Sequence, residues 1–367
     1  MTLFPPSACP RLIVKVGSAL LVTPDGAVRR AWLATLVADI AARVAAGQQV
    51  AIVSSGAIAL GARRLGLARG GRASLEDAQA AAATGQIALS QTWAELLGDH
   101  GLTAAQMLVT LDDLEDRRRY LNAAATLGRL LGLGVVPVIN ENDSVATEEI
   151  RFGDNDRLAA RVAQAAGAQG VVLLSDVDGL YDANPHTHAD ARHVAMVERI
   201  DAVADMADGG SASGMGSGGM VSKIAAARIA TAAGAHLAIA SGRLDHPLAG
   251  EQLHTLFVAE RAATARKAWL AGGLTARGAL HVDAGAARAL TAGSSLLAAG
   301  VTRIEGAFAR GDLVTINGPD GPLARGLSEY DAGDAIRLVG TRSDEQAAIL
   351  GYAPRSALVH RNHMALV

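Results

Sequence analysis

Short runs of apolar residues recur along the first two thirds of the chain. Each run is soon followed by Gly, Ser, Asn or Asp; they cover residues 11–16 (RLIVKV), 49–53 (QVAIV), 135–139 (VVPVI), 171–174 (VVLL) and 236–240 (HLAIA). Short runs without an alternating polar face are typical of strands that are buried on both sides of a parallel sheet. They predict five strands of such a sheet.

Segments with a helical period separate these runs. The first lies between residues 33 and 44, and further helical stretches near 76–97, 115–131, 156–166 and 222–233 alternate with the other strands. This alternation predicts a three-layer α/β/α domain with a mainly parallel sheet, which we place at residues 1–268. In such sheets the active site lies beyond the carboxyl ends of the strands.

The pattern of apolar segments and turn residues changes near residue 277. Short apolar runs follow one another, separated by Gly, Asp, Asn and Pro turns: ALHVD, TRIEG, DLVTI and AIRLV. This pattern predicts a second, small β-rich domain at residues 277–355, built as an antiparallel barrel or sandwich.

Length and charge narrow the classes of function. The chain has 367 residues, enough for two domains, and a net charge of -3. That balance gives no general attraction to nucleic acid or to an anionic membrane, so we expect a small ligand. The stretch 78–94 carries no charged residue but is too short to span a bilayer, and the opening residues lack a signal-peptide pattern.

Cys9 is the only cysteine in the sequence. It excludes an intrachain disulfide and fits a reducing compartment, so we expect a cytoplasmic protein. Its place near the N-terminus predicts a loosely held tail.

Lysine is scarce in this chain. There are 30 arginines and only three lysines, Lys15, Lys223 and Lys267. Lysine supplies a compact ammonium group where arginine supplies a broad planar fork, and a crowded phosphate pocket distinguishes the two. Lys15 and Lys223 both fall within glycine-containing motifs.

These two motifs have features of a phosphate site. VKVGSALL at 14–21 ends a strand and turns through Gly17, next to Lys15. SGMGSGGMVSK at 213–223 is a glycine-rich loop that runs into a predicted helix with Lys223 in its first turn. An ordinary turn and a flexible linker are the alternatives, but neither calls for a lysine.

Other polar groups follow the strands. VSSGAIALG at 53–61 ends in Ser54, Ser55 and Gly56 before a helix, and could hold a carboxylate; helix capping by Ser55 is the alternative. PVINENDSV at 137–145 and RFGDNDRLAA at 151–160 bring amides and carboxylates together. Polar turns are one explanation, and a site that reads an ammonium group or orients lysines and Mg²⁺ is the other.

Taken in order, VKVGSALL, VSSGAIALG, PVINENDSVATEEIRFGDND, LLSDVDGLY and GMGSGGMVSK resemble the amino acid kinase family. The similarity is greatest to the branch that phosphorylates the side-chain carboxylate of glutamate. It extends over almost the whole chain and includes DRRRYLNA at 116–123. After the kinase domain, HVDAGAARAL and GSSLL are similar to the PUA domain of the bacterial enzymes in that branch.

The resemblance implies roles for particular residues. Glutamate would be bound by Ser55, Asp143 and Asn155. The catalytic residues would be Lys15, Lys223 and Asp156, with Asp156 orienting the lysines. ATP would be bound by Lys15, Ser175, Asp176, Ser217, Gly218, Gly219, Met220, Val221, Ser222 and Lys223. The family often has Thr where this chain has Ser175 and Ser217, and both retain a hydroxyl.

The resemblance also implies a cofactor and partners. It implies Mg²⁺ carried mainly by the ATP phosphates, with no protein metal ligands assigned. It further implies the first step of proline synthesis, feedback inhibition by proline, and a homo-oligomer.

Two alternatives remain open from the sequence. Aspartate or N-acetylglutamate kinases would share the phosphate apparatus and differ in how they read the acceptor. A PUA-like domain could instead indicate an RNA-binding protein. Residues 278–354 carry a net charge of -3, however, which is opposite to an electrostatic footprint for RNA.

Overall fold

The computed structural model describes residues 3–23, 26–145, 154–185, 187–207, 219–259 and 275–367. The chain forms two compact units. Unit 1 comprises residues 1–115 and 123–260, and unit 2 comprises residues 116–122 and 261–367.

The strands and helices of unit 1 alternate along the chain. Its strands are β1 (Arg11–Val16), β2 (Gln49–Ser54), β3 (Ala104–Val109), β4 (Val136–Glu141), β5 (Gly170–Ser175), β6 (Leu180–Tyr181), β7 (His193–Val194), β8 (Met196–Val197), β9 (His236–Ser241) and β10 (His254–Phe257). The helices up to residue 260 are α1 (Ser18–Leu21), α2 (Arg30–Ala45), α3 (Ala57–Leu65), α4 (Leu75–Gly98), α5 (Leu111–Glu115), α6 (Arg117–Gly132), α7 (Asp154–Ala166) and α8 (Met220–Ala232), with 3₁₀ turns η1 (Ala68–Gly71) and η2 (Ile200–Ala207).

Eight strands of unit 1 form one sheet, in the order β3-β4-β2-β1-β5-β9-β10-β8. Neighbouring strands are parallel except β9 and β10, which are antiparallel. Strand β1 is central, and Lys15 near its end lies opposite Val53 of β2 and Leu173 of β5. The five predicted strands and the mainly parallel sheet are confirmed. Strands β3, β8 and β10 were not predicted.

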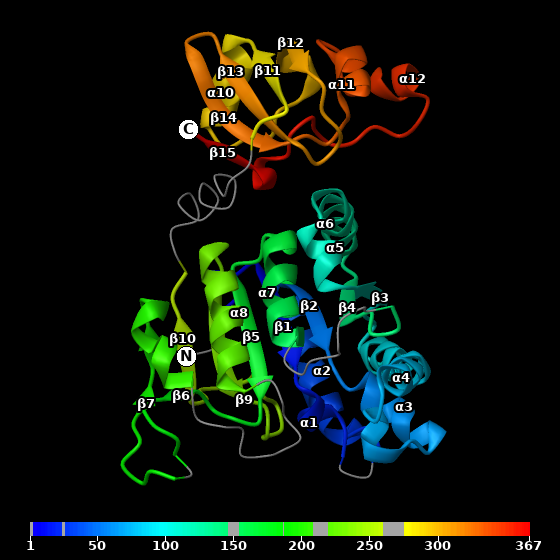
Figure 1. Cartoon of the computed structure of the whole chain (residues 1–367), viewed down its shortest axis with the longest axis vertical. Coiled ribbons are helices and arrows are strands. Elements are labelled where there is room, and N and C mark those ends of the chain that lie inside the picture. Colours follow the sequence, from blue (N-terminus) through cyan, green and yellow to red (C-terminus); the bar gives the residue numbers. More distant parts are fainter. Residues whose placement is uncertain (1–2, 24–25, 146–153, 186, 208–218, 260–274) are drawn as a thin grey trace. The chain divides into compact units, whose positions relative to one another are not determined.

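The sheet of unit 1 is covered by helices on both faces (Figure 1). Side chains of β1 alternate between two cores. Ile13 packs with Leu158 of α7 and Ile224 of α8, whereas Leu12 on the other face belongs to the cluster of Trp93 in α4. Burial on both faces explains why the central strands are apolar along their whole length. The predicted three-layer arrangement is confirmed.

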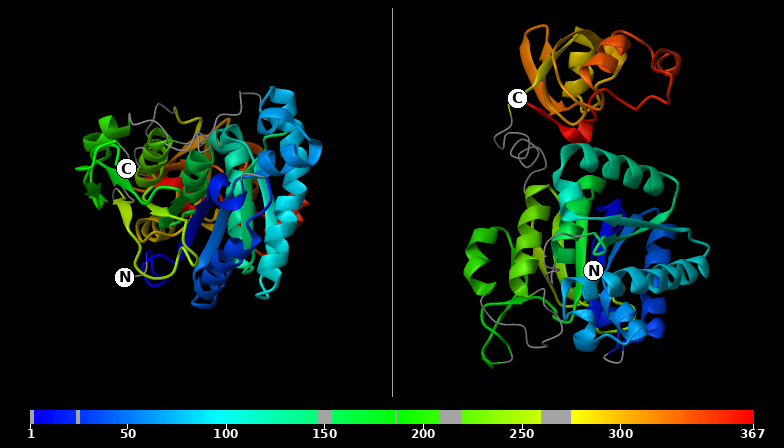
Figure 2. Two further views of the ribbon diagram at one scale, coloured as in Figure 1. Left: turned by 90° about the horizontal axis from the view of Figure 1, so that it is seen from below. Right: turned by 45° about the vertical axis from the view of Figure 1, so that its right-hand side comes forward.

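The strands of unit 2, coloured yellow to red in Figure 2, form a five-stranded sheet. Their order is β12-β11-β13-β14-β15. Strands β11 and β13 are parallel and the other pairs are antiparallel. The strands are β11 (Gly278–Val282), β12 (Val301–Gly306), β13 (Leu313–Gly318), β14 (Gly321–Leu327) and β15 (Met364–Leu366). The helices are α10 (Ala284–Thr291), α11 (Ala332–Leu338) and α12 (Gln346–Leu350), with 3₁₀ turns η3 (Ala298–Gly300) and η4 (Arg361–His363). The predicted β-rich character is confirmed.

Residues 335–339 (AIRLV) do not form a strand, contrary to the sequence analysis. They lie in and just after helix α11. Asp331 caps the start of this helix, because its side chain accepts a hydrogen bond from the amide of Asp334. Ala335 and Leu338, three positions apart, are buried on one face. The N-cap and this spacing outweigh the strand preference of Ile and Val.

The prediction of a loose tail around Cys9 was wrong. The Cys9 side chain is 2% exposed and packs in the core on the α2 side of the sheet. Two buried polar residues hold the chain before it: Gln48 donates to the Cys9 carbonyl at 2.5 Å, and Arg43 donates to the Phe4 carbonyl at 3.0 Å. These contacts satisfy the backbone of a segment that has no regular secondary structure.

No helix in the part of the chain that the structure describes is long and apolar enough to cross a membrane.

Candidate active site

Two lysines converge on one buried carboxylate at the centre of unit 1. Lys223 Nζ lies 2.9 Å from Asp156 Oδ2, and Lys15 Nζ makes an ion pair with the other oxygen of the same carboxylate. Asp156 is fully buried, and the side chains of Lys15 and Lys223 are 9% and 7% exposed. The predicted grouping of these three residues is therefore present in the structure.

Three separate elements position this cluster. Lys15 projects near the end of strand β1, Asp156 lies in the first turn of α7, and Lys223 in the first turn of α8. Helices α7 and α8 lie side by side over the central strands (Figure 1). The first turn of each helix presents backbone amides, so the surroundings of the lysines favour an anion.

Burial and mutual attraction set the charge states of the cluster. Burial lowers the pKa of Lys15, an effect that the Asp156 carboxylate opposes and the Lys223 ammonium reinforces. Burial alone would raise the pKa of Asp156, but attraction to Lys15 and Lys223 outweighs it and the pKa is lowered. Asp156 therefore stays ionised and supports positive charge on Lys15.

Ser175 is the last residue of strand β5, which lies next to β1 in the sheet, and Asp176 follows it. The Ser175 hydroxyl is buried and lies 3.1 Å from Asp176 Oδ1. Asp176 also acts on Lys15, because its charge raises the lysine's pKa. These two predicted ATP-binding residues are thus close to the lysine cluster.

Only part of the predicted glycine-rich loop can be placed. Ser217 and Gly218 lie outside the described residues. Gly219 precedes helix α8, and its carbonyl accepts from the amides of Ser222 and Lys223. Met220 is half-buried and Val221 is 60% exposed, whereas Lys223 in the same turn is buried.

The predicted acceptor residues Ser55 and Asn155 are in contact. Asn155, which immediately precedes Asp156, donates to the Ser55 hydroxyl at 2.8 Å and to Asn140 Oδ1 at 3.2 Å. Ser55 does not cap helix α3, since Gly56 occupies the capping position and no side chain caps it. Gly56 has φ of 103°, a conformation that glycine adopts without strain.

One oxygen of this amide group remains available. Asn155 Oδ1 is buried and accepts no hydrogen bond from any residue that the structure describes. A buried acceptor without a donor is costly, so it favours a ligand that brings an N–H group. An ammonium group would supply one.

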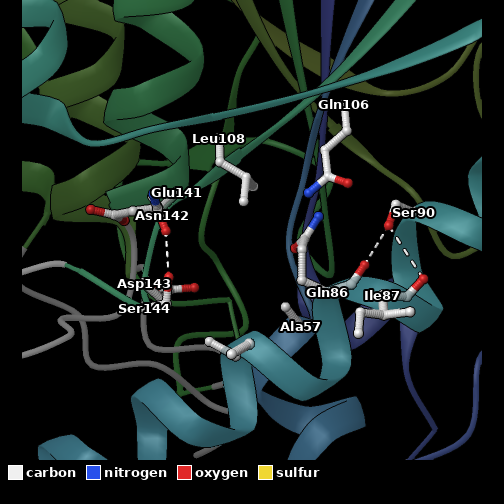
Figure 3. Close-up of a pocket in the computed structure, with 12 residues that line it drawn as sticks. Ala57, Gln86, Ile87, Ser90, Gln106, Leu108, Glu141, Asn142, Asp143 and Ser144 are labelled. Atoms are coloured by element: carbon white, nitrogen blue, oxygen red, sulfur yellow. Dashed lines mark hydrogen bonds between the residues drawn. The ribbon is translucent and has the colours of Figure 1, made fainter.

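Asp143 lines a pocket of about 480 Å³ beside these residues (Figure 3). The walls come from helix α4, strand β3, the start of α3 and the segment after β4; the residues are Ala57, Ala82, Ala83, Gln86, Ile87, Ser90, Gln106, Leu108, Glu141, Asn142, Asp143 and Ser144. The pocket combines two carboxylates with amides, hydroxyls and apolar side chains, which fits a small amino acid. No direct bond between Asp143 and Asn155 is present among the described contacts.

Asn140 and Gln86 are part of the site, although neither was predicted as a site residue. Asn140 is buried at the end of β4 and donates to Gln86 Oε1 at 2.8 Å. Gln86 lies on the inward face of α4 with Leu89 and Trp93, at helical spacing. A polar residue on an otherwise apolar face was the signal that could have identified it.

Helices α3 and α4 cross at very close range next to this network. A Cβ atom at Gly85 would lie 1.8 Å from the Ala57 carbonyl oxygen, and one at Gly61 would lie 1.7 Å from that of Ala81. Only glycine permits this approach. The crossing fixes Gln86 relative to the start of α3, where Ser55 and Gly56 lie.

No group of three or more His, Cys, Asp or Glu side chains within the described ranges is placed to hold a metal ion. The lysine cluster and the helix starts instead suit an anion such as a metal-bound triphosphate.

Models of two families match the chain. The amino acid kinase family matches residues 10–241, and the PUA domain matches residues 278–350.

Curated relatives match the chain over nearly its full length. It is 75% identical over 369 residues to a glutamate 5-kinase of Sphingopyxis alaskensis, with 100% of both chains covered. Identity is 63% to the glutamate 5-kinase of Novosphingobium aromaticivorans, covering 98% of this chain and 97% of the relative. It is 61% to that of Zymomonas mobilis, covering 99% and 93%.

Among solved structures, carbamate kinase from Giardia lamblia bound to AMP-PNP matches 68% of this chain and 98% of its own length, with a TM-score of 0.50. Its sequence identity is 14%, so this match concerns the fold alone.

Proposed function

The chain belongs to the amino acid kinase family, and from that premise we propose that it transfers the terminal phosphoryl group of ATP to the side-chain carboxylate of L-glutamate. Its relatives at 61% to 75% identity all carry the name glutamate 5-kinase, and they match it along almost the whole chain.

The observation that carries the proposal is the adjacency of Asn155 and Asp156. Asp156 pairs with Lys15 and Lys223, whereas Asn155 donates to Ser55 in the candidate acceptor site. Two consecutive residues in one helical turn therefore join a cationic site to an amide-lined site. Phosphoryl transfer needs this juxtaposition, because the donor phosphate and the acceptor oxygen must lie close together and in line.

The acceptor needs no general base. A glutamate side chain has a reference pKa of about 4.3 and is ionised at neutral pH, so its oxygen is already a nucleophile. That oxygen forms a bond to the terminal phosphorus of ATP as the bond to the bridging oxygen breaks, and ADP leaves. The difficulty is the approach of two anions, which positive charge relieves.

Residues of this chain supply that charge. We assign Lys15 and Lys223 to the phosphate oxygens and Asp156 to keeping both ammonium groups oriented. Ser175, Asp176 and the loop Ser217, Gly218, Gly219, Met220, Val221 and Ser222 are assigned to ATP. Mg²⁺ would arrive with the nucleotide and neutralise part of its phosphate charge.

The acceptor assignment rests on hydrogen-bonding complementarity. Ionised glutamate has two carboxylates, which only accept hydrogen bonds, and one ammonium group, which only donates. The Ser55 hydroxyl and the amides at the start of α3 suit a carboxylate. Asn155 Oδ1 and the Asp143 carboxylate suit the ammonium group.

The same assignment carries further proposals. We place the catalytic function within residues 1–268 and a PUA-like domain at residues 277–355, in a cytoplasmic homo-oligomer. The product would be the acyl phosphate that begins proline synthesis, and L-proline would act as a feedback inhibitor.

ADP release from Mg·ATP by the purified protein tests the reaction. The acceptors would be L-glutamate, L-aspartate, N-acetylglutamate, UMP or none, each with and without L-proline. We expect glutamate-dependent release that proline suppresses. The Lys223→Ala variant identifies any contaminating ATPase. Release with another acceptor would overturn the glutamate assignment, and no release with any acceptor would contradict the kinase proposal and favour a binding role for the PUA-like domain.

A further inference from the structure

Gln86 is the first member of a hydrogen-bonded series of side-chain amides that leads to the acceptor site. Among the described contacts, it makes none with the lysine cluster. Gln86 Oε1 accepts from Asn140 Nδ2 at 2.8 Å, and Asn140 Oδ1 accepts from Asn155 Nδ2 at 3.2 Å. Asn155 Nδ2 also donates to the Ser55 hydroxyl at 2.8 Å. We infer that Gln86 is a positioning residue that sets the direction of these amides and so selects acceptors bearing an ammonium group. This inference rests on the proposed function.

The direction of each amide in the chain follows from its partners. The Asn140 oxygen accepts from two donors, Asn155 Nδ2 and the backbone amide of Glu141 at 2.9 Å. Its nitrogen must therefore face the other way, where the Gln86 oxygen receives it. Because Asn140 is 2% exposed, water cannot readily replace that acceptor.

The direction of the Asn140 amide determines which atom Asn155 presents to a ligand. With its nitrogen held by Ser55 and Asn140, its oxygen is the atom left for a ligand. If the Asn140 amide turned over, its nitrogen would face the nitrogen of Asn155, and two donors would repel. Asn155 would then have to turn as well and would present N–H groups to the ligand, which disfavours an ammonium group.

Contacts of residues before and after Gln86 in helix α4 fix its position. Gly85 packs against the Ala57 carbonyl, and Trp93, two turns further along α4, donates from its indole nitrogen to the Ser54 hydroxyl at 2.9 Å. The backbone of α4 is thus fixed against the start of α3. Gln86 also lines the pocket that contains Asp143 (Figure 3).

Methionine at position 86 tests the inference, because it keeps the length of the side chain and removes the acceptor. We expect Gln86→Met to raise the KM for L-glutamate about tenfold, as a buried donor loses its partner, with the KM for ATP within about twofold. Glutarate, which is glutamate without the ammonium group, should inhibit competitively with a Ki changed less than about twofold, because it makes no use of the Asn155 oxygen.

Two further variants complete the test. Gln86→Glu keeps an oxygen acceptor for Asn140 and should stay within about threefold of the parent KM for glutamate. Gln91→Met, on the same helix but exposed and bonded to Glu95, should change nothing. Melting curves of all variants establish that each is folded.

Two results would overturn the inference. One is an unchanged KM for glutamate in Gln86→Met. The other is an equal rise in the glutamate KM and the glutarate Ki, which would indicate a general disturbance of the pocket. Failure of the proposed function is a separate observation, since it would show as absence of glutamate-dependent ADP release by the unsubstituted protein.

Discussion

Lys223 Nζ lies 2.9 Å from Asp156 Oδ2, a carboxylate that is fully buried and that also pairs with Lys15. This relationship explains why lysine occupies these two positions in a chain that has 30 arginines and one other lysine, Lys267. A single carboxylate accommodates two compact ammonium groups more easily than two planar guanidinium groups.

Removing the Lys223 ammonium should affect turnover more than binding. We expect Lys223→Ala to lower kcat about 10²- to 10³-fold, because charge that stabilises the transferring phosphoryl group is lost. The KM for glutamate should change little. Arg228→Ala is the matched control: it removes a cation from the same helix, where Arg228 pairs with exposed Asp201. Steady-state kinetics in which Lys223→Ala altered mainly the KM would contradict this role.

Substitution of Asn155 should affect the binding of the acceptor more than turnover. We expect Asn155→Ala to raise the KM for glutamate about 10- to 100-fold, since it removes an acceptor for a charged group, and to leave the KM for ATP nearly unchanged. Gln164→Ala removes a carboxamide from the same helix away from Ser55 and should behave as the parent protein. A loss confined to kcat would argue against a role in acceptor binding.

The crossing of α3 and α4 should be intolerant of any side chain. Gly85→Ala would place a Cβ atom against the backbone of Ala57, which cannot move as a flexible side chain can. We expect it to lower the free energy of unfolding by about 1–3 kcal/mol. Gly98 ends the same helix, and a Cβ atom added there would meet no neighbouring atom within 4 Å. We therefore expect Gly98→Ala to be neutral or to stabilise the protein by up to about 1 kcal/mol. Urea unfolding followed by tryptophan fluorescence would compare them, and equal midpoints for the two variants would refute the prediction.

The buried thiol of Cys9 should make stability depend on alkaline pH. Burial raises its pKa from 9.0 to about 11 despite attraction from Arg43. Below pH 9 the thiol is protonated in both folded and unfolded chains. Between pH 9 and pH 11 the unfolded chain releases the proton first, so the contribution of Cys9 to folding falls as pH rises. Urea midpoints measured from pH 8 to pH 11 should therefore decline more steeply for the parent protein than for Cys9→Ala. Parallel curves would contradict the predicted contribution of the thiol.

The sequence was most informative where burial is complete. Strands β1, β2, β4, β5 and β9 are buried on both faces, so their apolar runs stood out within a residue or two of the observed bounds. Strand β3 is at the edge of the sheet, contains Gln106, and is only partly buried, so its pattern resembles a loop. Edge strands lack the double burial on which the prediction relied.

The residues of the site also divide into those with a local sequence signal and those without one. The scarcity of lysine and the glycine-containing motifs singled out Lys15 and Lys223, and the family resemblance joined Asp156 to them. Gln86 escaped notice because its role depends on a partner 54 residues away, Asn140, and on a helix crossing that no local pattern encodes. The burial of Cys9 was missed for a similar reason, since Gln48 and Arg43 hold that segment from elsewhere in the chain.

The central place of β1 also bears on how the chain folds as it is synthesised. Strand β1 can pair with β2 once the chain has been synthesised to residue 54 and has left the ribosome. Its other edge has no partner until β5, residues 170–175, has been made. Over that interval a nascent chain presents an apolar strand with an open edge, which is a template for unwanted pairing. Translation through β5 closes that edge, and the ammonium of Lys15 meets its carboxylate in helix α7 only after more than half of unit 1 has been made.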